Sequence, residues 1–173
     1  EEAAAPLAVT LTLNDEIDIS RGDMIVEKDA LPHMSNRLRA KVVWMQEEAL
    51  IPHREYYIKM GTKLTSGSCE KIHHRVDVNT LEEKEADNLG LNEIGVADFS
   101  LQEPVVFDKY KVNQKTGAFI IIDRITNVTV GAGMVEQPLV EKEEDKAEVS
   151  AFEKEFNALV RKHFPHWGAK EIL

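Results

Sequence analysis

GAFIIIDRITNVTVGAGMV, at residues 117–135, is the stretch of the chain that decides its fold class. Four apolar residues, Phe119–Ile122, are followed by an acid, a base and a run rich in β-branched residues. β-Branched and aromatic side chains suit the pleated surface of a strand. Gly131 and Gly133 favour a bend or a close approach of the backbone. We therefore expect one long buried strand, or two strands at a bend, at the centre of a β-barrel.

Length and composition restrict the class of protein. The chain has 173 residues, a formal net charge of −10 and a single cysteine, Cys69. A chain of this length builds one ordinary domain and a small extra piece, and one cysteine excludes an intrachain disulfide framework. No apolar run approaches the roughly 20 residues that cross a bilayer, and no signal-peptide pattern is visible. We expect a cytoplasmic protein that does not bind a membrane. The acidic balance also argues against broad contact with a phosphate backbone.

Short apolar or alternating runs, separated by turn signals, occupy most of the chain. They predict strands at residues 7–13, 17–19, 24–26, 38–45, 56–60, 65–78, 94–101 and 105–107. Pro32 interrupts the chain, so we place a domain boundary near residues 29–34. Thr80 and Glu83 fit a capping box for one short helical turn within the charged segment 79–92. Many short strands and almost no helix indicate a closed barrel or a sandwich.

The end of the chain has a different composition. Residues 136–148 are expected to form a charged linker, because their acids and lysines carry no periodic apolar positions. Ser150 and Glu153 form a second capping box, and Pro165 ends the amphipathic helix that follows. Such a helix needs a cover for its apolar face, either the barrel's own surface or another protein chain. The residues that we predict to contact a partner are Phe152, Phe156, Leu159, Val160 and Trp167.

Three segments resemble elongation-factor-type GTPases: IDISRGDMIV at 17–26, KVVWM at 41–45, and the stretch at 117–135. Within that superfamily the chain is most similar to the GTP-binding large subunits of bacterial sulfate adenylyltransferases. The discriminating segment is SAFEKEFNALVRKHFPHWGAKEIL at 150–173, which resembles the end of those subunits. A translation factor, in contrast, ends shortly after its third barrel. The resemblance covers nearly the whole chain.

The resemblance implies an all-β fold with four parts. Residues 1–30 would be the closing strands of a second barrel, and residues 35–135 a six-stranded Greek-key barrel like the third domain of these GTPases. Residues 136–148 would be the charged linker, and residues 149–173 an amphipathic helix with an aromatic tail.

The sequence contains neither a G-x-x-x-x-G-K-[ST] phosphate loop nor an Asn-Lys-x-Asp motif. We therefore expect GTP and Mg²⁺ to bind a nucleotide domain upstream of Glu1. In the chain itself we expect no catalytic residue, no cofactor and no metal ligand. The resemblance implies that a smaller subunit joins ATP and sulfate into adenylyl sulfate and pyrophosphate, a step of sulfate assimilation and cysteine biosynthesis. GTP hydrolysis on the large subunit would drive that step.

These implications favour a non-catalytic scaffold. Its expected partners are the small catalytic subunit and the large subunit's own GTPase domain, with no nucleic acid and no membrane. One alternative is an elongation-factor-like barrel that binds transfer RNA, which the charge of −10 and the lack of a basic stripe oppose. An independent enzyme has less support, because no nucleophile with a base and an orienting group is visible. Strands at 7–26 without their own barrel would fold back onto the third barrel or pair in a dimer.

The spacing of the histidines does not favour a metal site. His73 and His74 are adjacent, so on a strand they would face opposite sides, and no cysteine or acid completes a zinc-like set. His163 and His166 lie three residues apart, but Pro165 between them breaks the helical geometry that could bring them together. We expect a structural role for this aromatic segment.

Two groups of charged residues remain. Asp123 and Arg124 sit inside the central apolar stretch and would face opposite ways on a strand. We expect Arg124 at the barrel rim and Asp123 hydrogen-bonded to a loop; the functional alternative is contact with the GTPase domain. The acids Glu82, Glu83 and Glu85 could imitate a catalytic pair. On an exposed loop they form a solvated face, because nothing buries them to shift a pKa.

Overall fold

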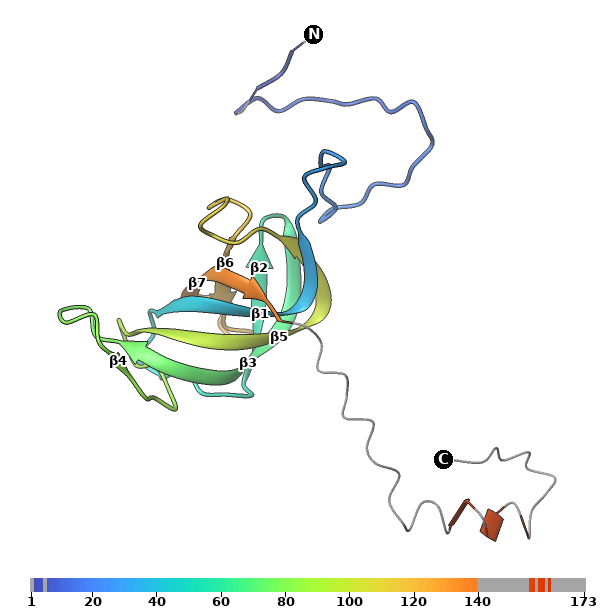
Figure 1. Ribbon diagram of the computed structural model, residues 1–173. Helices are drawn as coiled ribbons and strands as arrows, with labels where there is room; N and C mark the ends of the chain where they lie inside the picture. The colour runs from blue at the N-terminus through green and yellow to red at the C-terminus, as the bar shows by residue number, and fades with distance from the viewer. Residues whose placement is uncertain (1, 5, 140–155, 158, 161, 163–173) are drawn as a thin grey trace. The chain divides into compact units, whose positions relative to one another are not determined.

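The computed structural model describes residues 2–4, 6–139, 156, 157, 159, 160 and 162. The chain divides into two units, Glu1–Pro138 and Leu139–Leu173. The first unit contains the strands (Figure 1). They are β1 (His33–Trp44), β2 (Glu55–Met60), β3 (Lys63–Val76), β4 (Glu83–Lys84), β5 (Ile94–Phe107), β6 (Ala118–Ile122) and β7 (Thr129–Pro138). No helix among the residues described is long and apolar enough to cross a membrane.

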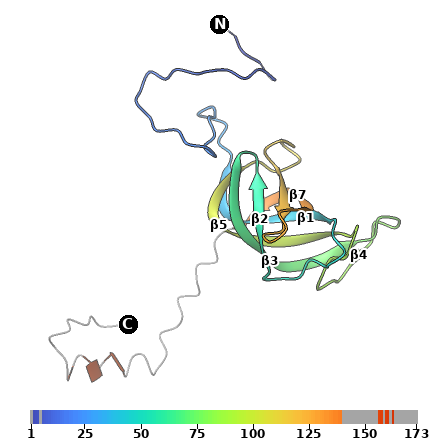
Figure 2. The ribbon, with the colours of Figure 1, turned by 180° about the vertical axis from the view of Figure 1, so that it is seen from behind.

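Six of these strands close into a barrel, which Figure 2 shows from behind. The order around it is β2-β6-β7-β1-β5-β3, and a further pairing of β2 with β3 joins the two ends. Every pairing is antiparallel. β1 pairs with β5 and β7 and not with its chain neighbour β2, which is a Greek-key type of connection. The predicted six-stranded barrel is confirmed, and β4 is a two-residue addition to the end of β3.

The barrel is filled by the inward side chains of its strands, with large aromatic residues at the centre. Trp44 and Tyr56 meet edge to face with ring centroids 5.7 Å apart, and Phe99 and Phe119 meet in the same way at 5.5 Å. These are favourable arrangements for aromatic pairs. A Cβ built on Gly133 would lie 2.1 Å from the Phe119 ring, so this glycine is the close approach predicted from the sequence.

The central stretch forms two strands at a bend, the second of the two predicted arrangements. β6 ends at Ile122 and β7 begins at Thr129. The β-branched residues between them do not belong to a strand: Ile125 is 87% exposed and Val128 is 58% exposed. Asp123 explains the difference, because its side chain accepts hydrogen bonds from the backbone of the next residues and bends the chain.

The strands predicted at 7–13, 17–19 and 24–26 are not formed. Leu7 to Leu13 still alternate in sequence, but all four apolar side chains of that run are exposed by 47% or more. A strand requires a neighbour that accepts and donates its backbone hydrogen bonds. The six barrel strands already pair on both sides, so this segment finds no partner in the part of the chain that the structure describes.

Three smaller predictions are also corrected. The helical turn expected at Thr80 is absent, because Asp77 accepts from the backbone N–H groups of residues 79 and 80 and closes a turn into β4. The break expected at 103–104 lies inside β5, where the pairing with β1 shifts register. The first residues of the expected linker, 136–138, belong to β7.

Candidate interaction surface

Asp123 anchors the turn between β6 and β7. Its Oδ1 atom accepts hydrogen bonds from the backbone N–H of Ile125 at 3.0 Å and from the N–H and hydroxyl of Thr126 at 2.8 and 3.0 Å. Its Oδ2 atom lies 2.9 Å from Arg54 Nη2. The backbone hydrogen bond from Thr126 contributes most to lowering the pKa of the Asp123 carboxyl. The predicted hydrogen bonding of Asp123 to a loop is confirmed.

Arg124 lies at the rim, as predicted. Its guanidinium pairs with the exposed carboxylate of Glu55 and lies over the ring of Tyr57, 5.3 Å from its centroid. Rim pairs of this kind contribute little to stability. The side chain nevertheless remains accessible to a partner, since it is 40% exposed.

The two adjacent histidines contact different carboxylates. His73 Nε2 lies 2.8 Å from Asp98 Oδ2, while His74 Nε2 lies 3.4 Å from Glu83 Oε1. Asp98 also receives two hydrogen bonds from Arg39, at 2.7 and 3.0 Å. Among the residues described, no group of three or more His, Cys, Asp or Glu side chains could hold a metal ion.

Cys69 and the three glutamates near β4 are further reactive side chains that the structure describes. Cys69 is fully buried, and burial raises the pKa of its thiol to about 12. A thiol with that pKa is not a nucleophile at neutral pH. Glu82, Glu83 and Glu85 are all exposed, in keeping with the predicted solvated face.

Five residues were predicted to contact a partner, and the structure describes three of them. Phe156, Leu159 and Val160 have helical backbone conformation. Phe156 and Leu159 are 57% and 52% exposed, whereas Val160 is 8% exposed. Phe152 and Trp167 lie outside the described residues, and so do His163 and His166.

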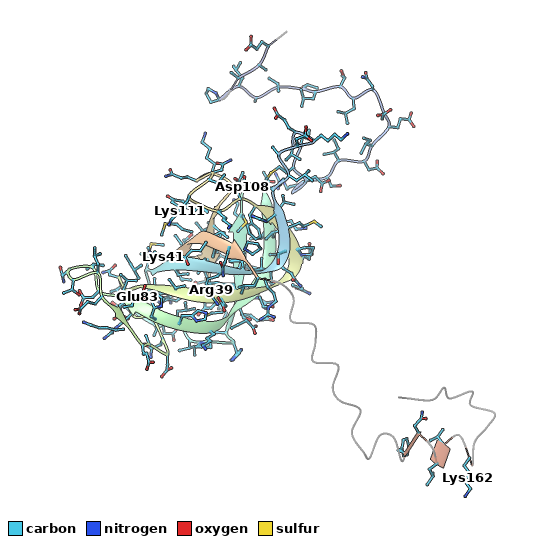
Figure 3. All side chains as sticks on the ribbon, viewed as in Figure 1. Arg39, Lys41, Glu83, Asp108, Lys111 and Lys162 are labelled. Atoms are coloured by element: carbon cyan, nitrogen blue, oxygen red, sulfur yellow. The ribbon has the colours of Figure 1, made fainter. Side chains whose placement is uncertain are left out.

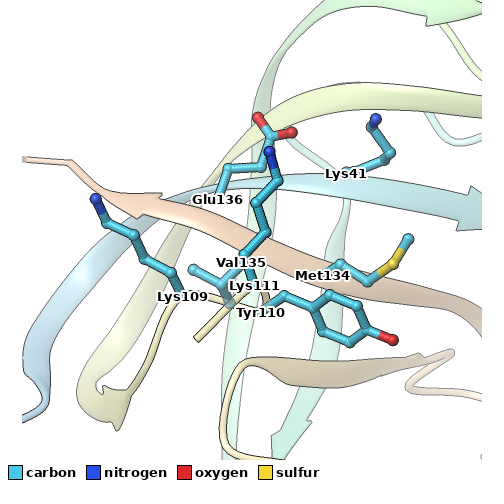
Figure 4. Close-up of a pocket in the computed structure, with 7 residues that line it drawn as sticks. All are labelled: Lys41, Lys109, Tyr110, Lys111, Met134, Val135 and Glu136. Atoms are coloured by element: carbon cyan, nitrogen blue, oxygen red, sulfur yellow. The ribbon is translucent and has the colours of Figure 1, made fainter. Parts of the chain in front are cut away.

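The sequence analysis missed a hollow on the outer wall of the barrel. It has a volume of about 550 Å³, and Figure 4 shows the side chains around it. They are Lys41, Lys109, Tyr110, Lys111, Met134, Val135 and Glu136. One signal was available in the central stretch, where the positions alternating with the core residues are also apolar. A wall that faces water normally alternates apolar with polar residues.

Comparisons with known proteins agree with this architecture. The family described as "GTP-eEF1A C-terminal domain-like" matches residues 37–136, which is more than half of the chain. The chain belongs to this family. Two crystal structures of Sup35, one complexed with GDP and one with GMPPNP, have the same fold as this GTP-eEF1A C-terminal-like barrel. The GDP complex has a TM-score of 0.58 at 20% identity, with 65% of this chain and 28% of that chain covered.

Other relatives have a higher sequence identity, and their alignments cover residues outside the barrel as well. "Sulfate adenylyltransferase subunit 1" of Shewanella woodyi is 58% identical over 172 residues, and that of Vibrio parahaemolyticus is also 58% identical over 172 residues. The protein of the same name from Francisella tularensis subsp. novicida is 55% identical over 173 residues. In each case 99% of this chain is covered. The chain spans only 36–37% of the length of these relatives.

Proposed function

We propose that this chain is the C-terminal scaffold of a sulfate adenylyltransferase subunit 1 and that it performs no chemistry itself. The enzyme would make adenylyl sulfate and pyrophosphate from ATP and sulfate, coupled to GTP hydrolysis. The observation that carries the proposal is the 53–58% identity, over nearly the full length of the chain, to proteins of that name. The matched region covers 99% of the chain, so it extends past the barrel into the last 35 residues, which the family match does not reach.

The geometry supports a holding role. A closed barrel has no free sheet edge and presents a rigid wall on which other domains can be placed. Three of its titratable groups have a place in the fold: Asp123 caps a turn, Asp98 is paired with Arg39, and Cys69 is buried. In this proposal GTP and Mg²⁺ bind another part of the subunit. The barrel then keeps that part and the smaller catalytic subunit in a fixed relation.

The proposal also assigns a structural role to the N-terminal segment. Residues 7–26 would complete a preceding barrel in the longer subunit. That assignment accounts for an alternating pattern whose apolar side chains are all exposed here, including Leu7, Leu11 and Ile17 at more than 60%. A period of two marks a strand that covers a core on one side.

A pull-down with the second subunit tests the function. We expect the 173-residue chain to retain that subunit, and a chain ending at Leu139 to retain less of it, because the proposed contact residues are then missing. The shorter chain keeps all of β7, which ends at Pro138. Equal recovery of the second subunit by both chains would show that residues 140–173 do not contribute to binding it. Adenylyl sulfate synthesis or GTP cleavage by the 173-residue chain alone would refute the scaffold proposal.

A further inference from the structure

Part of the outer face of β1, β7, β6 and β2 carries apolar side chains, where a barrel wall that faces water is normally polar. The strand register places its outward side chains in two cross-strand rows. The first row is Lys41, Met134 and Ala118, and the second is Val43, Ala132, Ile120 and Lys59. Most of these side chains are only partly exposed. Because the inward positions of the same strands fill the core, this part of the wall is apolar on both sides.

Small residues make this face concave. Ala118 and Ala132 stand between larger neighbours, and a second hollow of about 530 Å³ lies over them. This hollow shares Tyr110 and Met134 with the one of about 550 Å³ described above, so the two adjoin. Tyr110 is held in place because its backbone N–H donates to the carbonyl of Val135 at 2.8 Å. We call these two adjoining hollows the hollow face.

Lysines surround the hollow face. Lys41, Lys109 and Lys111 line the first hollow together with one acid, Glu136, and Lys59 lines the second. Figure 3 shows Lys41 and Lys111 on the same side of the barrel. Four lysines and one carboxylate form a local positive frame in a chain whose net charge is −10. An apolar floor with a charged rim is the usual composition of a protein–protein interface.

We propose that the hollow face binds an apolar ridge, flanked by Asp and Glu side chains, on the second subunit of the enzyme. The proposal rests on the proposed function, since the relatives' name, subunit 1, implies a further subunit. The hollows supply room for protruding apolar side chains, and the lysines select carboxylates beside them. Nucleic acid is disfavoured, because its contacts require basic groups throughout the surface and not only at the edge.

Photo-crosslinking of the complex of full-length subunit 1 with the second subunit tests the location. A photoreactive amino acid replaces Ile120 on the hollow face, and in a matched control it replaces Ser68, an outward residue of β3. We expect the probe at 120 to yield an adduct with an acid-flanked apolar peptide of the second subunit, and the probe at 68 to yield none. Adducts at 120 only within subunit 1, or with a second copy of it, would overturn the proposal.

Charge reversal tests the chemistry. Lys111→Glu is expected to weaken the affinity for the second subunit by about tenfold at low salt and to flatten its salt dependence. Lys71→Glu makes the same change at an exposed position of β3 and should alter the affinity less than about twofold. Equal affinities of both variants would refute the proposed surface while leaving the scaffold function intact. Failure of wild-type subunit 1 to bind the second subunit would instead refute the proposed function.

Discussion

Arg54 Nη2 lies 2.9 Å from Asp123 Oδ2, so the loop before β2 is tied to the turn between β6 and β7. Arg54 also donates to Glu48 at 2.7 Å and lies over the ring of Tyr56, 5.4 Å from its centroid. The Asp123 side chain is 5% exposed. A nearly buried carboxylate is tolerated only with a full set of partners. This one has a guanidinium, two backbone N–H groups and a hydroxyl.

Replacing Asp123 should therefore destabilise the barrel. Asp123→Ala removes both side-chain oxygens that accept hydrogen bonds in the turn, whereas Asp123→Asn keeps one oxygen for the backbone N–H groups. We expect the urea midpoint to fall in the order wild type, Asn variant, Ala variant, as measured by tryptophan fluorescence. Asp87→Ala, at an exposed aspartate, should leave the midpoint nearly unchanged. A full-length Ala variant with an unchanged midpoint but reduced GTP turnover would instead support contact of Asp123 with the GTPase domain.

Acid should weaken the fold partly through Asp98. Burial opposes ionisation of this carboxyl, but the hydrogen bonds from Arg39 and the close approach of the His73 ring outweigh burial and lower its pKa below the ordinary 3.8. A carboxyl with a lowered pKa in the folded state stabilises the protein above pH 3.8, and that contribution is lost as the pH falls through the folded-state value. We expect the urea midpoint to decline below about pH 4. The decline should be shallower in Asp98→Asn, and equal slopes would exclude this role for Asp98.

Gly133 should not accept any side chain. A Cβ there would lie 2.1 Å from the Phe119 ring, and overpacking of this kind costs about 1–3 kcal/mol. We expect Gly133→Ala to lower the free energy of unfolding by that amount. Gly90→Ala is the control, because the nearest atom to its Cβ would be 3.6 Å away. Phe119→Leu should restore part of the loss in the double variant; strictly additive losses would show that the ring is not the obstacle.

The single cysteine should be inert in the folded protein. Cys69 has no exposed surface, and with a thiol pKa of about 12 only about one molecule in ten thousand carries a thiolate at pH 8. We expect a disulfide reagent such as DTNB to react within seconds in denaturant and very slowly without it. Fast reaction of the native chain would mean that β3 opens readily.

The barrel could be predicted from the sequence, because the inward residues of its strands are strongly apolar and turn signals separate the strands. Leu38, Val42, Ile58 and Phe99 all fall in predicted strands and are all buried. The turn at residues 123–128 was harder to predict. β-Branched residues such as Ile125 favour strands wherever no side chain competes for the hydrogen bonds of the backbone. The side chain of Asp123 does compete, and that depends on Arg54, which is 69 residues away in the chain.

The hollow face could not be predicted from the sequence for a related reason. Its members come from four strands and a loop, and only the register brings Lys41 beside Met134 and Val43 beside Ala132. Register is a property of pairs of strands and cannot be read from either strand alone. Helix residues such as Phe156 could be proposed from the sequence because a helix places its apolar face within one continuous segment, and their contact with a partner stays a prediction.

Hydrogen exchange at the N-terminal segment tests whether residues 7–26 form strands only when the rest of the subunit is present. In the structure the backbone N–H of Leu7 donates to the carbonyl of Ala4, and no backbone bond is present for residues 8–13 among the residues described. We therefore expect the amides of residues 8–13 to exchange at nearly the unprotected rate in the 173-residue chain, while those of Val42 and Phe99 are protected. In full-length subunit 1 the same six amides should become protected, because the preceding barrel then supplies the neighbouring strands. Protection already present in the short chain would point to pairing between copies, which light scattering would reveal as a dimer. Absence of protection in the full-length subunit would show that this segment is not a strand of the preceding barrel.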